Sequence, residues 1–573
     1  MDVASITALI MTLALLWPAI MSQQSAMATR NPTEDYDRRS SAWRQSNWTT
    51  HPNVLKEWSS APLALPATEA DDGFNLLFQS NRKELSNFPV TFEQPLPPWL
   101  IGNLVRNGLG LFENGPRTFL HAFDGFAKLA SWKFFGNSTV LFSTRFIRSD
   151  FYKASKEAKT IAPYLLFQAV APPFGYVEKL QCLVRGLDNM NVNVYAFPNP
   201  KTGRAEYAAL SDFWILYKIG IENLTTVHRV APKLKNRQQT TSSWLQGTGF
   251  LDLLSSAHPL PEPGTNNSLT FLSSVAVLPW SRNVISLIRV KSLKRRTVVA
   301  QWNVGRVPYM HSFSVTATKA ILLASPFYVN VMCMAKKAEP FSCLDWHPEE
   351  KSTLYIVTLK SGKVTTVHLD NVFSMHHVNA YDVGKQEIIM DLSTYPSPDF
   401  VKHLQLHVMR DPLARNSFDA HARLKRFSIN LKKLEVREIP IDSNPRPSLA
   451  TLLDMPVINE AYRSKHYCYV YGLVLKTDNV TLSNIAIVKK DLCSNGTGDR
   501  AWQAPGNYPV EPWFVARPDA RVEDDGVLLL PVLDGNRRST YLAILDARTL
   551  TLVNRAELPT NIPYSLHGRF FPV

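Results

Sequence analysis

The chain has 573 residues, of which 45% are hydrophobic and 11% aromatic, and it carries a formal net charge of +14. This apolar content is ample for a large folded core and excludes an intrinsically disordered protein. The charge would suit an anionic partner, but the basic residues are dispersed, and neither an RNA-recognition signature nor a Cys/His finger accompanies them. We therefore predict no nucleic-acid partner.

The first predicted element is an apolar segment, residues 3–21, that carries no charge. Ala26-Met27-Ala28 follows with the small-x-small pattern of a cleavage site, so residues 1–28 are typical of a signal peptide. Because about 20 apolar residues can span a bilayer, a membrane anchor is the other interpretation. Six N-glycosylation sequons fit entry into the secretory pathway; they lie at Asn47, Asn137, Asn223, Asn266, Asn479 and Asn495. We predict the secretory pathway (lumenal, membrane-associated or secreted), with a cytoplasmic, peripherally membrane-associated protein as the alternative.

Residues 29–72 are polar and lack clear periodicity, which indicates a linker or a wrapping arm. From residue 73 to residue 573, short apolar runs alternate with turn clusters, for example at 140–146, 284–290 and 527–532. Frequent strands at near-regular intervals predict a single all-β domain, built as a barrel, a sandwich or a propeller. The pattern alone does not give a number of blades.

The five cysteines include no CxxC pair and no zinc-ligand spacing. In a chain of this length they do not indicate a disulfide framework. Cys333 and Cys343 are close enough in sequence to pair across a loop, but reduced thiols are the default expectation. No P-loop, HExxH or GxSxG motif occurs, so nothing supports a nucleotide cofactor or these hydrolase chemistries.

Four histidines lie in or beside strand-like runs spread over some three hundred residues. Histidines at the ends of strands are brought together by a rigid sheet scaffold, so this pattern favours one shared metal ion over a local finger. A second histidine, His377, adjoins His376, but neighbours on a strand face opposite ways and only one can point at a shared centre. The candidates are His258, His311, His567 and one of the neighbours His376 and His377.

The contexts of these histidines resemble the carotenoid cleavage oxygenases, the family that also holds the retinoid isomerase of the retinal pigment epithelium. Residues 106–112 resemble the family's Arg-Asn-Gly-Pro-Gly signature, with Leu109 in place of Pro, and residues 121–125 resemble His-x-Phe-Asp-Gly. Residues 191–195, 454–459 and 523–526 resemble further landmarks in the same order. The resemblance runs from about residue 74 to the end.

This resemblance implies a seven-bladed β-propeller, capped by loops and helices that enclose a tunnel to an axial iron(II). It implies that His258, His311, His376 and His567 bind the iron, with His376 chosen over His377 by its spacing to Asn379. In the family, three glutamates orient three of the ligands, and the matching positions are Asp212, Asp454 and Glu511. Each aspartate is one methylene shorter than glutamate, which can break a direct contact or demand a bridging water.

The resemblance also implies a carotenoid, apocarotenoid or retinoid substrate and dioxygen. Residues 162–167 and 171–176 occupy the region where animal relatives carry a membrane-dipping loop, so they predict either peripheral membrane contact or a buried connection. Three functions follow: an iron(II) dioxygenase that cleaves a conjugated C=C bond to carbonyl products such as retinal, an isomerohydrolase-like iron enzyme, or a carotenoid-binding protein with a degraded centre.

Overall fold

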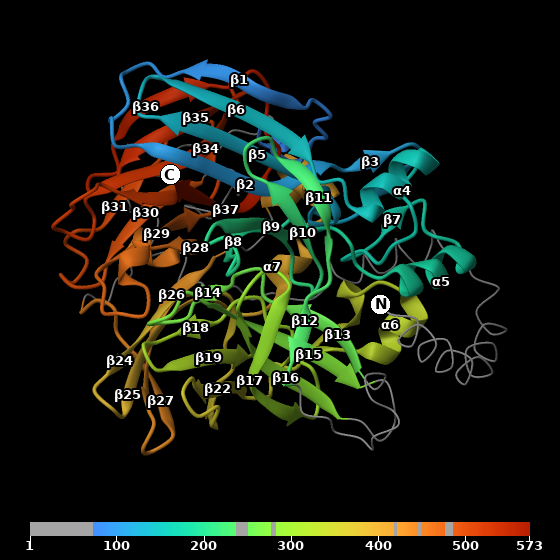
Figure 1. Ribbon diagram of the computed structural model, residues 1–573, viewed down its shortest axis with the longest axis vertical. Coiled ribbons are helices and arrows are strands. Elements are labelled where there is room, and N and C mark those ends of the chain that lie inside the picture. Colours follow the sequence, from blue (N-terminus) through green and yellow to red (C-terminus); the bar gives the residue numbers. More distant parts are fainter. Residues whose placement is uncertain (1–72, 237–249, 277–281, 417–420, 444–447, 476–484) are drawn as a thin grey trace.

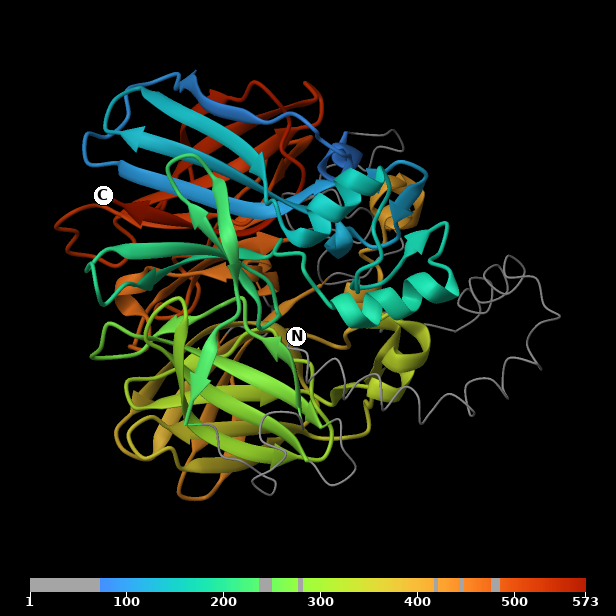
Figure 2. The same ribbon diagram turned by 45° about the vertical axis from the view of Figure 1, so that its right-hand side comes forward.

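The computed structural model describes residues 73–236, 250–276, 282–416, 421–443, 448–475 and 485–573. The predicted signal peptide or anchor (1–28) and arm (29–72) lie outside these residues, as does the sequon at Asn479. The described chain is a ring of seven sheets with helices gathered at one side (Figures 1 and 2).

Each of the seven sheets forms one blade, which confirms the predicted seven-bladed propeller. Blade 1 holds β1 (Leu85–Thr91), β6 (Thr139–Phe146), β5 (Phe126–Phe135), β2 (Ile101–Leu111) and β37 (Ser565–Pro572). Blade 2 holds β11 (Thr225–Val230), β10 (Leu216–Gly220), β9 (Ala205–Leu210) and β8 (Asn193–Pro198). Blade 3 holds β12 (Lys233–Lys235), β17 (Arg295–Val304), β16 (Asn283–Val290), β15 (Ser268–Ala276), β13 (Phe250–Ser255) and β14 (Leu260–Pro261). Blade 4 holds β18 (Ser314–Val315), β19 (Lys319–Ala324), β22 (Ser352–Thr358) and β23 (Val364–Leu369).

The remaining blades follow in chain order. Blade 5 holds β24 (Phe373–Val383), β25 (Glu387–Tyr395), β26 (Arg423–Asn430) and β27 (Glu435–Ile439). Blade 6 holds β28 (Asp454–Val457), β29 (Tyr469–Val474), β30 (Ala486–Asp491) and β31 (Arg500–Trp502). Blade 7 holds β32 (Asn507–Pro509), β34 (Gly526–Asp534), β35 (Ser539–Asp546), β36 (Leu552–Glu557) and β33 (Trp513–Ala516).

The ring is closed by the two ends of the domain. The last strand, β37, pairs antiparallel with β2, and His567 lies opposite Asn107 in this pair (Figure 1). Gly108, at the bulge beside it, approaches the Ser565 backbone so closely that a Cβ would lie 2.5 Å from its Cα. The glycine of the Arg-Asn-Gly signature is therefore needed for the close approach of β37 to β2, the pairing that closes the ring.

A cap of short elements covers one side of the propeller (Figure 2). Its helices are α4 (Asp150–Ala158), α5 (Tyr176–Arg185), α6 (Val331–Lys337), α7 (Asp399–Lys402), α8 (Leu406–Arg410) and α9 (Pro412–Asn416), with 3-10 turns η1 (Phe74–Phe78), η2 (Ala122–Asp124) and η4 (Phe341–Cys343). Two small sheets join them, β3 (Glu113–Asn114), β4 (Arg117–Phe119) and β7 (Val170–Ala171), and β20 (Phe327–Val329) with β21 (Leu344–Trp346). No helix in the described ranges is long and apolar enough to cross a membrane.

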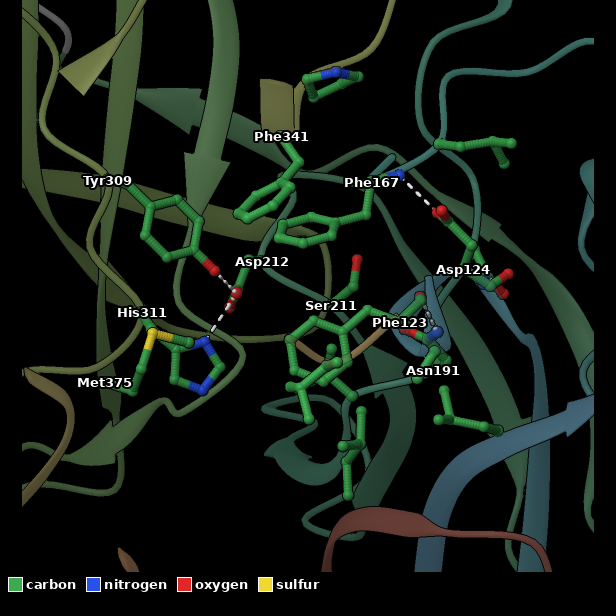
Figure 3. Close-up of a pocket in the computed structure, with 18 of the residues that line it drawn as sticks. Phe123, Asp124, Phe167, Asn191, Ser211, Asp212, Tyr309, His311, Phe341 and Met375 are labelled. Atoms are coloured by element: carbon green, nitrogen blue, oxygen red, sulfur yellow. Dashed lines mark hydrogen bonds and ion pairs between the residues drawn. The ribbon is translucent and has the colours of Figure 1, made fainter. Parts of the chain in front are cut away.

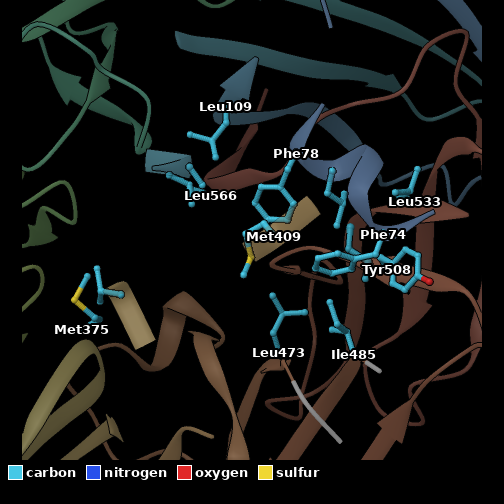
Figure 4. Close-up of a cluster of buried hydrophobic side chains, with 14 of the residues drawn as sticks. Phe74, Phe78, Leu109, Met375, Met409, Leu473, Ile485, Tyr508, Leu533 and Leu566 are labelled. Atoms are coloured by element: carbon cyan, nitrogen blue, oxygen red, sulfur yellow. The ribbon is translucent and has the colours of Figure 1, made fainter. Parts of the chain in front are cut away.

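The largest apolar cluster lies between cap and blades (Figure 4). Phe74 and Phe78 of η1 and Met409 of α8 pack there against blade residues such as Leu473 and Leu533. Because these side chains are almost fully removed from water, the cluster fixes the cap on the propeller by the hydrophobic effect.

The default expectation of reduced cysteines is wrong. Cys333 of α6 is bonded to Cys343 of η4, and Cys468 is bonded to Cys493, with Cα atoms 5.4 and 5.1 Å apart, within the range that a disulfide spans. Cys182 is a buried free thiol. Sequence spacing could not place Cys468 beside Cys493, because β29 and β30 have to pair first.

Candidate metal centre and its cavity

The propeller brings the four predicted histidines together on its axis. His258 lies between β13 and β14, His311 precedes β18, His376 is on β24 and His567 is on β37. Their ligand nitrogens all lie within 4.8 Å of one another, and three of the rings are buried. The Nε2 atoms of His258 and His311 are 2.9 Å apart.

Three of these imidazoles are fixed by carboxylates, which leaves the far ring nitrogen for the shared centre. Nδ1 of His311 lies 2.7 Å from Oδ2 of Asp212 (Figure 3), and Nδ1 of His567 lies 2.7 Å from Oε1 of Glu511. Nδ1 of His376 lies 2.8 Å from an Asp454 oxygen. The missing methylene of the two aspartates breaks neither contact and needs no bridging water, since both carboxylates reach their histidines directly.

Each blade contributes one residue to this arrangement. The histidines come from blades 1, 3, 4 and 5, whereas Asp212, Asp454 and Glu511 come from blades 2, 6 and 7. A carboxylate on one blade thus orients an imidazole on another, and the site exists only when the ring is closed.

Sequence reasoning missed the groups that hold the carboxylates. The Tyr309 hydroxyl donates to Oδ2 of Asp212 across 3.1 Å, and the Tyr395 hydroxyl donates to Oδ2 of Asp454 across 2.6 Å. Arg106 forms a 2.7 Å ion pair with Glu511. Arg106 belongs to the Arg-Asn-Gly signature, and this signature could have indicated its role. Nothing in the sequence indicates the roles of the two tyrosines.

Burial and charge set the protonation of the centre. Burial, reinforced by the other histidines, holds the pKa of His258 well below its ordinary value. Burial also lowers the pKa of His567, although Glu511 opposes the shift. For His376, burial acts to lower the pKa, but the charge and hydrogen bond of Asp454 outweigh this effect, so the pKa is raised above its ordinary value.

The donor set fits a divalent transition metal. Nε2 of His376 is buried without a hydrogen-bond partner among the described residues, a costly state unless a ligand satisfies it. Two nitrogens bound side by side to one ion at roughly 2.1 Å lie roughly 3 Å apart, close to the separation of His258 and His311. Imidazole suits iron, zinc, copper and nickel alike.

His377 lies outside the cluster. Its Nδ1 atom is 2.8 Å from the Ser314 hydroxyl, and burial lowers its pKa to about 3, so it is a neutral imidazole with a hydrogen-bond partner of its own. The adjacent histidines of β24 therefore face different surroundings, as strand periodicity predicts.

An apolar cavity of about 170 Å³ leads from the cap to the centre. His311, His376 and His567 line its inner end, together with Asp212 and Asp454. Mainly aromatic and aliphatic side chains line the remainder, and in Figure 3 the rings of Phe167 and Phe341 lie side by side above Asp212. Their centroids are 4.7 Å apart in a stacked arrangement.

The segment proposed to touch a membrane divides into two parts. Leu165, Leu166 and Phe167 line the cavity and are mostly buried, so the end of the segment 162–167 forms part of its wall. Residues 171–176 are mostly exposed and lead into α5, where Tyr176 is 43% and Val177 66% exposed.

Known proteins resemble the chain over most of its length. The family model described as retinal pigment epithelial membrane protein matches residues 78–572. Human beta,beta-carotene 15,15'-dioxygenase is 26% identical over 542 residues, covering 87% of this chain and 94% of the human one. Rice chloroplastic carotenoid cleavage dioxygenase 8 homolog A is 27% identical over 525 residues, covering 86% and 87%.

Solved structures agree with the fold. An ACO/RPE65 chimera superposes with a TM-score of 0.71 at 24% identity, covering 89% of this chain and all of its own. A mutant of Synechocystis apocarotenoid oxygenase gives 0.70 at 23% identity, with 89% and 100% covered. The match over residues 78–572, on a propeller that gathers four histidines at its axis, shows that this chain belongs to the retinal pigment epithelial membrane protein family of carotenoid cleavage oxygenases.

Proposed function

We propose that the protein is a non-haem iron(II) dioxygenase that cleaves a conjugated C=C bond of a carotenoid or apocarotenoid to two carbonyl products. The observation that carries this proposal is the meeting of an aromatic-lined apolar cavity with the four-histidine centre. A polyene offers apolar surface and no charge, so only such a cavity can hold it. The curated relatives include carotenoid dioxygenases from human and rice.

The chain's residues would hold iron(II) through the Nε2 atoms of His258, His311, His376 and His567. Bound iron(II) supplies the one-electron chemistry that lets dioxygen react with the polyene. Neutral imidazoles leave the charge of the ion uncancelled, and the carboxylates of Asp212, Asp454 and Glu511 fix the ring tautomers from outside.

The cavity wall would orient the substrate and exclude water. Oδ1 of Asp124 accepts a hydrogen bond from the Phe167 backbone, and Oδ2 accepts one from Gln168. The Phe341 backbone donates to the Phe167 carbonyl. Because Phe167 is held from both sides, its ring is a rigid part of the wall, and a polyene lying along it is placed with a defined bond near the histidines.

The direct carboxylate contacts support an intact centre over a carrier with a degraded one. Mass spectrometry of products tests the proposal: the iron-loaded protein is incubated with β-carotene, apocarotenals and a retinyl ester, with and without oxygen. Oxygen-dependent aldehydes are expected. Oxygen-independent retinol would identify an isomerohydrolase, and an intact polyene recovered on the protein would identify a carrier.

We further propose peripheral membrane contact and a secretory route. The exposed Tyr176 and Val177 at the start of α5, followed on the same helix by Lys179 and Arg185, fit a surface that inserts apolar side chains and attracts anionic headgroups. Two disulfides are typical of proteins folded in an oxidising compartment. Vesicle flotation with Val177→Glu, and glycan analysis of the expressed protein, test the two proposals.

A further inference from the structure

A second cavity, of about 80 Å³, reaches the four-histidine centre separately from the apolar one. His258, which does not line the apolar cavity, lines this one, whereas His311 lines only the apolar cavity. His376 and His567 line both. The centre therefore lies between two cavities, and each presents different atoms to it.

The second cavity has a far larger polar share in its wall than the apolar cavity. Besides its histidines, His377 among them, it is lined by Asn193, Ser312 and Glu511, by a cluster of Glu460, Arg463 and Arg569, and by apolar side chains such as Leu260, Phe313 and Val457. Glu460 lies 2.6 Å from Arg463 and 3.9 Å from Arg569. The side chain of Glu460 is 32% exposed and that of Arg569 is 23% exposed, so this cluster joins the cavity to solvent.

The charges of this cluster do not cancel within it. Arg463 and Arg569 bring two positive charges against the single carboxylate of Glu460, and Glu511 is already paired with Arg106 and His567. The Arg569 guanidinium stacks over the rings of Tyr195 and Trp513, which fixes it at the edge of the second cavity. Glu460 is therefore the group that offsets the local positive field.

The two cavities differ most in how they would receive a hydrated cation. A divalent ion keeps its water shell unless protein oxygens and nitrogens replace it, and its desolvation in an apolar wall is very costly. The apolar cavity presents mainly aromatic and aliphatic side chains along its length, whereas the second places carboxylate, amide, hydroxyl, guanidinium and imidazole groups among its apolar side chains.

We propose that the second cavity is the passage by which a divalent metal ion enters the four-histidine centre, with Glu460 setting the charge at its mouth, while the apolar cavity serves the polyene. This inference rests on the proposed function in one respect, that the histidines bind a metal. The metal ion and the polyene reach the centre by different routes, so a protein with a polyene in place can still take up metal.

The charges of this cluster predict whether each substitution slows or speeds the entry of the metal ion. Glu460→Gln leaves two uncompensated guanidinium groups at the mouth and slows the entry of a cation. Arg463→Gln removes one of them and speeds it. Glu438→Gln is the matched control, because Glu438 lies on β27, the outermost strand of blade 5, and forms an exposed ion pair with Lys425 of β26.

The experiment follows Co²⁺ absorbance after mixing the full, chelator-stripped chain with Co²⁺, at low salt because screening weakens such effects. We expect several-fold slower uptake in Glu460→Gln, faster uptake in Arg463→Gln and no change in Glu438→Gln, all with the same final absorbance. We also expect a bound apocarotenal to leave the wild-type rate unchanged. Equal rates in all variants, or a block by the apocarotenal, would overturn the passage.

The metal content of protein purified from iron-fed cells keeps this test separate from the proposed function. If that protein holds no iron and the stripped chain takes up no Co²⁺, the metal centre itself is refuted. If it holds iron but the folded, stripped chain never takes up Co²⁺, metal enters only during folding, and the passage alone is refuted.

Discussion

Asp454 reaches His376 directly, with 2.8 Å between the carboxylate oxygen and Nδ1, although it is one methylene shorter than the glutamate of the family pattern. Its second oxygen accepts a hydrogen bond from the Tyr395 hydroxyl, so both carboxylate oxygens have a hydrogen-bond partner. The centre is thus built around the shorter side chain, with a tyrosine on its outer side.

Removal of this carboxylate tests the contact. Asp454→Ala leaves Nδ1 of His376 and the Tyr395 hydroxyl without their shared acceptor, and we expect metal affinity to fall about 10–100-fold, the usual loss when such a partner is removed. Co²⁺ titration measures the affinity, with Asp370→Ala, on an exposed ion pair with Lys351, as control. Asp454→Glu should also weaken binding, because a longer side chain displaces His376 or Tyr395. Wild-type affinity in Asp454→Ala would contradict the role.

The adjacent histidines of β24 provide a matched pair. His376→Ala should abolish stoichiometric iron retention, because it removes the buried Nε2 that has no other partner among the described residues. His377→Ala should retain iron, because its ring is hydrogen-bonded to Ser314 outside the cluster. Iron analysis of both purified proteins, with circular dichroism to check folding, decides the matter. Equal iron in the two variants would refute the assignment of His376.

The family signatures predicted the blade number and the four histidines, because those residues are fixed by their neighbours in sequence. Tyr309 and Tyr395 were not predictable, since their roles depend on contacts with aspartates 97 and 59 residues away. The Cys468–Cys493 bridge depends likewise on the pairing of β29 with β30. The second cavity was not predictable either, because its charged cluster joins η6 (Glu460–Tyr462) to β37 and forms only in the closed ring.

The aromatic wall should control polyene binding without affecting the metal. Phe341→Leu removes a ring that stacks on Phe167 at the cavity wall, and loss of such a contact costs about 0.5–1.5 kcal/mol beyond burial. We expect several-fold weaker apocarotenal binding by fluorescence quenching, with unchanged iron content. Phe142→Leu, in the separate cluster behind blade 1, is the control for general destabilisation. Equal weakening in both variants would show a stability effect only.

Metal affinity should rise with pH. A metal binds only neutral imidazole, so protons compete with it. The pKa of His376 is raised above its ordinary 6.5, whereas those of His258 and His567 are lowered. His376 is therefore the last of these three to lose its proton, and affinity should still increase as the pH rises through and above 6.5. Co²⁺ titrations between about pH 5 and pH 8 test this; a plateau reached below pH 6 would contradict it.

The disulfides can be counted directly. Alkylation of the denatured, unreduced protein should label Cys182 alone, whereas prior reduction should expose all five cysteines to the reagent. Peptide mass spectrometry identifies the labelled positions. Labelling of Cys333 and Cys343 without reduction would show that the turn between α6 and η4 is not covalently closed in the expressed protein.

The central claim is that the four-histidine centre cleaves a polyene with dioxygen. Its most direct test is incubation of the iron-loaded protein with a carotenoid under isotopically heavy dioxygen, followed by mass spectrometry of the carbonyl products, with His376→Ala and His377→Ala alongside. We predict heavy oxygen in the products of the wild type and of His377→Ala, and no products from His376→Ala. Products that contain only oxygen from water, or an uncleaved polyene with the wild type, would contradict the account.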